Sequence, residues 1–232
     1  SVITNISLDH VERLGRTIPE IAEQKAGIIK PGRPVVTAAR DPEALAVIER
    51  VAAEQGAPLW RIGREFEAQR LGYGEGWQRF SVRTPRREHA DLMIPLAGAF
   101  QVENAATAVA ALDLLGTVEE EIPAEAIQRG LAEVRIAGRM EVLRRAPLFL
   151  IDGAHNAASA TALAGALREL YPGRRRILIL GVSADHSAAD VVGTLAPDAA
   201  IVIATQADNP RALPAEAVAA EARRHVADVR IA

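Results

Sequence analysis

Two lysines stand out in a chain whose other basic residues are all arginine. Of the 27 basic residues, only Lys25 and Lys30 are lysines. Apolar residues precede Lys25 by four and seven positions, at Ile21 and Ile18, so helical spacing predicts that Lys25 lies on a buried stripe. Burial favours a neutral amine, which can add CO₂ to form a carbamate, an oxygen ligand for a hard cation that arginine cannot make. The spacing equally fits a lysine whose aliphatic stem packs at the edge of a core while its amine stays in water.

Three more side chains that could bind a ligand follow strand-like segments. His10 comes soon after the β-branched stretch 1–6. Asp152 and His155 follow an expected buried strand and precede an expected helix. The carboxyl ends of parallel strands carry ligand-binding groups, so this position favours Asp152 and His155 as ligand contacts and His10 as a metal ligand. A lone histidine is more often structural, and spacing alone does not decide the role of His10.

Neither glycine-rich segment of the chain has the pattern of a phosphate-binding loop. Gly27 and Gly32 are followed by Arg33-Pro34 instead of the Lys-Ser/Thr that a P-loop needs for phosphate and Mg²⁺. The stretch Gly72–Gly76 opens no helix and is typical of a hairpin connection. If the protein binds a nucleotide, its phosphate loop lies outside this chain.

The elements that must position these residues alternate between strands and helices, which predicts an α/β fold. A capping box at Thr17 and Glu20 begins a helix that runs to about Ala26. In the first part we expect strands at 1–6 and 35–37, hairpin strands between 59 and 96, and helices at 42–55, 101–115 and 123–132. In the second part we expect strands at 140–145, 148–152, 176–182 and 200–205, and helices at 157–170, 187–195 and 214–225. Apolar runs at 177–180 and 201–203 predict parallel strands covered on both faces.

Composition excludes several classes of protein. The 232 residues carry a net charge of −3 and no cysteine, and no apolar run approaches the length of a membrane helix. The charge and the lack of a membrane helix predict a protein with no nucleic acid or membrane partner, and the absence of cysteine fits a reducing compartment. We expect a cytoplasmic monomer, although the sequence leaves the oligomeric state open. The first residue is Ser1, residues 1–6 resemble a strand already in progress, and 228–232 resemble a strand just beginning. The chain is expected to be part of a longer protein.

Four motifs, in this order, resemble the folylpolyglutamate synthase/dihydrofolate synthase family of the Mur ligase superfamily. They are Ile3–His10, Lys25–Gly32, Gly138–Glu141 and Asp152–Asn156. The resemblance implies the C-terminal part of a P-loop-type ATPase domain at 1–136. A Rossmann-like C-terminal domain with a mostly parallel sheet would follow at 137–232. It further implies a ligase that uses ATP and Mg²⁺ to join L-glutamate to dihydropteroate or folates through an acyl phosphate.

The resemblance also assigns roles to individual residues. It implies that His10 binds Mg²⁺, that Lys25 is a carbamylated catalytic lysine and metal ligand, and that His155 lies near the transferred phosphoryl group. Asn104 would contact the adenine of ATP, Arg139 its phosphates and Asp152 the nucleotide. An amide suits an adenine edge and a planar guanidinium suits phosphate, although an ordinary helix polar residue and a surface arginine fit the same positions.

Some alternatives stay open from the sequence. Asp208–Arg211 has the letters of a motif that marks the diaminopimelate-adding Mur ligase, so a UDP-muramyl-peptide ligase is the first alternative. The second alternative is that the isolated chain is an inactive fragment with only residual nucleotide binding. His186 stands where the family usually has lysine, which leaves that position without an implied role. The sequence does not separate dihydrofolate synthesis from polyglutamate extension.

Overall fold

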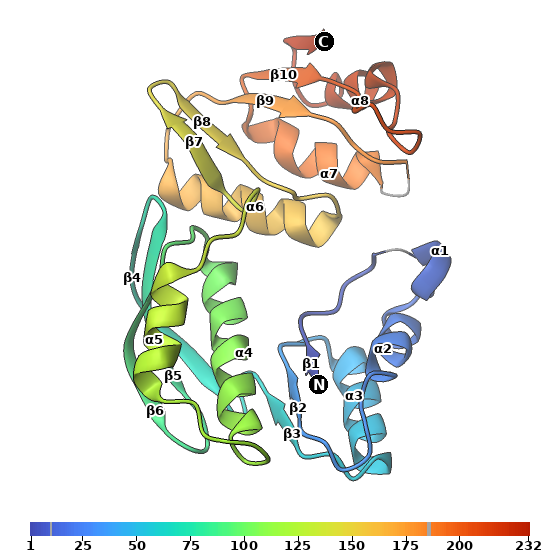
Figure 1. The fold of residues 1–232 in the computed structure, drawn as a ribbon. Helices are drawn as coiled ribbons and strands as arrows, with labels where there is room; N and C mark the ends of the chain where they lie inside the picture. Colours follow the sequence, from blue (N-terminus) through green and yellow to red (C-terminus); the bar gives the residue numbers. More distant parts are fainter. Residues whose placement is uncertain (10, 185–186) are drawn as a thin grey trace. The chain divides into compact units, whose positions relative to one another are not determined.

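The computed structural model describes residues 1–9, 11–184 and 187–232 and divides into two compact units, Ser1–Ile151 and Asp152–Ala232 (Figure 1). Each unit has its own sheet and helices. The expected domain boundary between residues 136 and 137 stays a prediction, because compactness alone does not define where a family's domains meet. None of the described helices is long and apolar enough to cross a membrane.

The first unit begins with a three-stranded parallel sheet in the order β1-β2-β3. Its strands are β1 (Val2–Ile3), β2 (Val35–Thr37) and β3 (Leu59–Arg61). The central strand is fully buried: Val35 packs with the apolar residues of the helices that follow β1 and β2, and Val36 packs into a second core. This confirms the expectation of a short buried strand at 35–37.

Helices α2 (Ile18–Ala26) and α3 (Pro42–Glu54) lie beside this sheet, and the short helix α1 (Val11–Leu14) precedes them (Figure 1). Thr17 and Glu20 form the predicted capping box at the start of α2. Asp41 caps α3 by accepting from two backbone N–H groups, and Pro42 occupies the first turn, where a missing N–H costs nothing. The caps therefore begin both helices where the sequence predicts.

An antiparallel sheet follows, made of β4 (Glu67–Gly74), β5 (Trp77–Arg83) and β6 (Glu88–Ile94). The glycine-rich stretch is the hairpin connection that the sequence predicts, with Gly76 at a φ of 95°. The indole of Trp77 lies against Gly72 and Gly74. It comes so close to Gly74 that a β-carbon there would clash with the ring. Helices α4 (Ala99–Leu115) and α5 (Ala124–Glu133) cover this sheet through a core that includes Phe80.

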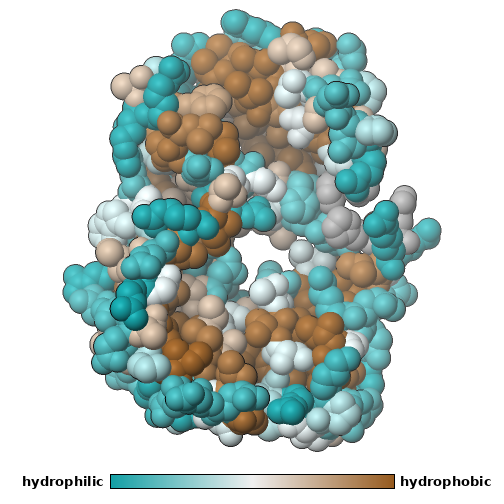
Figure 2. Space-filling view, viewed as in Figure 1, coloured by the Kyte–Doolittle hydropathy of each residue, from teal (hydrophilic) through white to brown (hydrophobic). Residues whose placement is uncertain are grey.

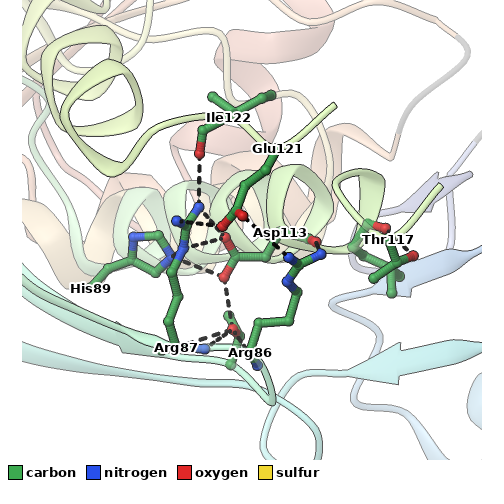
Figure 3. Close-up of polar contacts among 9 residues, drawn as sticks. Arg86, Arg87, His89, Asp113, Thr117, Glu121 and Ile122 are labelled. Carbon is green, nitrogen blue, oxygen red and sulfur yellow. Dashed lines mark hydrogen bonds and ion pairs between the residues drawn. The ribbon is translucent and has the colours of Figure 1, made fainter. Parts of the chain in front are cut away.

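A buried carboxylate joins α4 to the turn between β5 and β6 (Figure 3). The side chain of Asp113 has no exposed surface and accepts hydrogen bonds from Thr84 Oγ1 at 2.7 Å and Arg87 Nε at 3.0 Å. His89 Nε2 lies 2.9 Å from the same carboxylate. Arg87 Nε also lies 3.3 Å from His89 Nε2. Because Nε2 must carry a proton to donate to Asp113, it cannot accept a hydrogen bond from Arg87 as well. The opposite side of the Arg87 guanidinium binds Glu121, which ties the α4–α5 connection to the network.

The network predicts an acid-sensitive contribution to stability. Burial by itself would raise the pKa of Asp113, but hydrogen bonds from His89 and Thr84 outweigh it and hold the pKa below the usual aspartate range. A carboxylate with a lowered pKa stabilises the fold above its unfolded-state pKa, and that contribution disappears as the pH falls towards the native pKa. We expect the unfolding free energy to fall below about pH 4. Urea unfolding measured at several pH values from 7 to 3 gives this dependence. If the unfolding free energy of Asp113→Asn fell with pH as steeply as that of the parent chain, the prediction would be wrong.

The segment after Gly138 differs from the predicted parallel arrangement. Strands β7 (Glu141–Arg145) and β8 (Leu148–Ile151) form an antiparallel two-stranded sheet and cluster with the first unit. Phe149 and Ile151 are exposed, so the expectation that a buried strand precedes Asp152 is wrong. A two-stranded hairpin has two faces, and apolar residues in its sequence do not show whether either face packs against a core.

The second unit contains a parallel sheet in the order β11-β10-β9. Its strands are β9 (Ile177–Leu180), β10 (Ile201–Ala204) and β11 (Val229–Ile231). Its helices are α6 (Ala157–Leu170), α7 (Ala188–Leu195) and α8 (Ala215–Ala222), with a 3₁₀ turn at Ala196–Asp198. This alternation agrees with the predicted elements.

One prediction about this sheet is wrong. Val202 of β10 is buried, but Ile177 and Ile179 of β9 are 58% and 54% exposed, so β9 is covered on one face only. Figure 2 shows an apolar area of surface over these strands. An apolar run shows that a strand can be buried on both faces, but burial also requires a second layer of side chains.

Candidate functional site

Lys25 lies on the last turn of α2 and is exposed. The buried residues of this helix are Ile21, Ala22 and Ala26, so the prediction that Lys25 lies on the buried stripe is wrong. Helical geometry does point Lys25 between the directions of Ile21 and Ala22. Direction alone does not bury a residue, however, because other side chains must also lie over it. Among the described residues, the amine has no hydrogen-bond or ion-pair partner.

His10, proposed above as a metal ligand, lies outside the described residues, as does His186. Within the described ranges 1–9, 11–184 and 187–232, no group of three His, Asp or Glu side chains could hold a metal ion. The described side chains therefore do not by themselves fit a Mg²⁺ site. Metal binding through His10 and Lys25 stays a prediction.

Asn104 lies on the second turn of α4 and is exposed. The helix begins after Gly98, whose φ of 89° suits glycine, and it has no side-chain cap. Asn104 Nδ2 donates to Gln101 Oε1 at 3.1 Å, and Gln101 is only 3% exposed. Asn104 is thus an exposed amide that a buried neighbour orients, and one amide edge faces the solvent.

Arg139 lies in the turn that enters β7 and is exposed. Gly138 and Met140, on either side of it, have positive φ values of 66° and 46°. Gly138 N donates to Glu141 Oε2 at 2.8 Å, which closes the turn, and Met140 is buried. The turn directs the Arg139 side chain outward, and among the described residues it has no hydrogen-bond or ion-pair partner that would hold it back.

Asp152 and His155 lie together in the turn that begins α6. Asp152 Oδ1 accepts from Ala154 N at 2.8 Å, which makes a turn of the kind that aspartate favours. His155 Nδ1 lies 2.8 Å from Gly153 O, so this nitrogen carries a proton and donates it to the carbonyl. Asn156 then caps α6 together with Ser159. The turn orders both side chains, and the histidine is exposed.

The structure groups these residues only in part. Asp152 and His155 share one turn of the second unit, whereas Lys25, Asn104 and Arg139 come from three separate segments of the first. Asp152 follows β8, which pairs only with β7 among the described strands. Asp152 is therefore not at the edge of a parallel sheet, and that argument for its role is wrong. Gln101 was not expected to take part in the site, although a glutamine three residues before Asn104 on a helix indicates a side-chain contact.

Comparison with known proteins gives the same order of domains as the motifs. The Mur ligase middle domain family matches residues 1–112, and the family described as Mur ligase, glutamate ligase domain matches residues 138–232. The folylpolyglutamate synthase of Lacticaseibacillus casei is 36% identical over 217 residues, which is 92% of this chain and 50% of that protein. The dihydrofolate synthase/folylpolyglutamate synthase of Bacillus subtilis is 34% identical over 216 residues, 91% of this chain and 50% of that protein.

A solved structure supports the same assignment. The Mycobacterium tuberculosis folylpolyglutamate synthase complexed with ADP superposes with a TM-score of 0.92 at 32% identity, covering all of this chain and 52% of that one. This chain spans about half the length of these relatives. It belongs to the Mur ligase superfamily, in the branch of the folylpolyglutamate and dihydrofolate synthases.

Proposed function

We propose that this chain is part of an ATP-dependent ligase that adds L-glutamate to dihydropteroate, to folates, or to both. The observation that carries the proposal is the match of the whole chain to a folylpolyglutamate synthase complexed with ADP. The ordered match to the two Mur ligase domain families supports it. The expectations of a cytoplasmic, monomeric enzyme belong to the same proposal.

The proposed reaction has two steps. A carboxylate oxygen of the pterin substrate attacks the γ-phosphorus of ATP, and ADP leaves with the electrons of the broken bond. The amine of glutamate then attacks the acyl phosphate carbon, loses a proton and displaces inorganic phosphate, which leaves an amide. Positioning and charge stabilisation supply most of the catalysis in such phosphoryl transfers.

Each candidate residue has a task in this proposal that suits its chemistry. Asn104 offers a donor and an acceptor side by side to adenine, and the outward guanidinium of Arg139 offers parallel donors to phosphate oxygens. Asp152 contacts the nucleotide. His155 is close to the transferred phosphoryl group, where its Nε2 can accept or return a proton. ATP enters as its Mg²⁺ complex, and the described side chains alone do not hold that ion.

The test is glutamate-dependent ADP release by the full-length protein. We expect turnover with dihydropteroate or a folate and none with a UDP-muramyl peptide. Turnover with the UDP-muramyl peptide alone would assign the protein to the alternative Mur ligase activity. The 232-residue chain measured beside the full-length protein decides whether the fragment retains any ATP hydrolysis; we expect none above the buffer rate.

A further inference from the structure

The first two turns of α4 carry a pair of amides with opposite exposure. Gln101 is 3% exposed, and Asn104, one turn further along, is exposed. They are joined by the hydrogen bond from Asn104 Nδ2 to Gln101 Oε1 at 3.1 Å. An amide group has two hydrogens on its nitrogen, so this bond uses one and leaves the other, with Oδ1, facing away from Gln101.

The direction of this bond decides which base the free edge of Asn104 can pair with. Adenine presents a 6-amino donor beside a ring-nitrogen acceptor, which matches an amide oxygen beside an amide hydrogen. Guanine presents an oxygen at position 6, so it matches only an amide rotated by 180°, with the nitrogen and oxygen exchanged. An asparagine free to rotate can satisfy either base, whereas an asparagine held in one orientation cannot.

Gln101 is well placed to hold that orientation. Its neighbours Val102, Ala105 and Ala106 are buried in the core between α4 and the antiparallel sheet, which fixes the first turn of the helix. A buried glutamine cannot turn freely into solvent, and rotating the Asn104 amide would place its oxygen against Gln101 Oε1. Two facing acceptors repel each other, and the hydrogen bond returns only if the Gln101 amide rotates as well, which its near-complete burial opposes.

We propose that Gln101 is a positioning residue that locks the Asn104 amide in the adenine-reading orientation and thereby sets the preference for ATP over GTP. The inference rests on the proposed function, in which Asn104 contacts the base of the nucleotide. Gln101 itself touches no substrate and acts through Asn104. Base selectivity is therefore a property of the pair.

The experiment measures kcat and KM for ATP and GTP with the full-length ligase and three variants. Gln101→Met keeps the length of the side chain and removes the acceptor, and we expect the ATP/GTP ratio of kcat/KM to fall about tenfold. The change should appear mainly in KM, because the reacting groups are untouched. Gln101→Glu keeps an oxygen acceptor for Asn104 Nδ2 and should retain the ratio. Gln128→Met, at an exposed glutamine on α5, is the matched control and should match the parent enzyme.

A fourth variant separates this inference from the proposed function. If Asn104→Ala lowers the ATP/GTP ratio and Gln101→Met does not, Asn104 reads the base but Gln101 does not position it, and the inference is wrong. If Asn104→Ala leaves the ratio unchanged, the base contact in the proposed function is wrong. The inference would also be wrong if Gln101→Glu lowered the ATP/GTP ratio of kcat/KM as much as Gln101→Met does. Thermal melts of each variant confirm that the enzymes compared are folded.

Discussion

Replacing Lys25 by arginine is expected to lower the kcat of the full-length ligase by about a hundredfold or more while leaving its melting temperature unchanged. The expected loss rests on the carbamate that the family resemblance implies at Lys25, since an amine can add CO₂ to give a carbamate oxygen and a guanidinium cannot. The reason for the unchanged stability is structural. Lys25 is exposed on the last turn of α2, and arginine has a similar helix propensity and the same charge.

The chain offers a matched control for this prediction in Lys30, its only other lysine, which is also exposed. Lys30→Arg should keep activity within about twofold, as ordinary surface substitutions do. Mass spectrometry of the native enzyme should show one added carboxyl group that the Lys25→Arg variant lacks. Full activity in Lys25→Arg, or the absence of that added mass in an active parent enzyme, would refute the carbamate.

Asp113→Asn is expected to lower the unfolding free energy of the first unit by about 3 kcal/mol. The side chain of Asp113 has no exposed surface and faces Thr84, Arg87 and His89. An asparagine in its place keeps the shape but loses the charge and turns an NH₂ group towards donors. The guanidinium of Arg87 then lacks its buried counter-charge, and removal of one partner from such a pair is the costly case.

Asp91→Asn is the control for this change, since it removes the same charge from the same type of residue. Its partner is Arg79, and both side chains are more than half exposed, at 57% and 56%. Exposed pairs contribute less than about 1 kcal/mol, so the control should unfold close to the parent chain. Urea unfolding measures the free energy of unfolding of both variants, and the two are comparable when the dependence on denaturant concentration is unchanged. Equal losses in the two variants would show that burial of Asp113 contributes nothing special.

The local elements were largely predictable because short-range chemistry specifies them. Thr17 with Glu20, and Asp41 with Pro42, place the starts of α2 and α3, since a cap satisfies backbone groups within three residues of itself. The hairpin at Gly76 is similarly a local choice of positive φ. The helices and most strands therefore lie within a few residues of their predicted ranges.

Burial was predicted less well, because it depends on partners distant in the sequence. Lys25 has the spacing of a buried position and is exposed, and Ile179 belongs to an apolar run and is half in water. The opposite case is Asp113, a charged residue that no pattern marks as buried. Three residues face its carboxylate, Thr84, Arg87 and His89, and they meet there only because the β5–β6 turn and the α4–α5 connection come together at the end of α4.

The sequence by itself determined the α/β class, the start of each capped helix and the family to which the chain belongs, because residue types at fixed short spacings carry all three. Only the tertiary structure decided that β7 and β8 pair antiparallel, that Lys25 faces solvent and that Asn104 donates a hydrogen bond to the buried Gln101. Strand pairing and burial are set by free energies of contact between distant segments, and periodicity reports only the direction in which a side chain points.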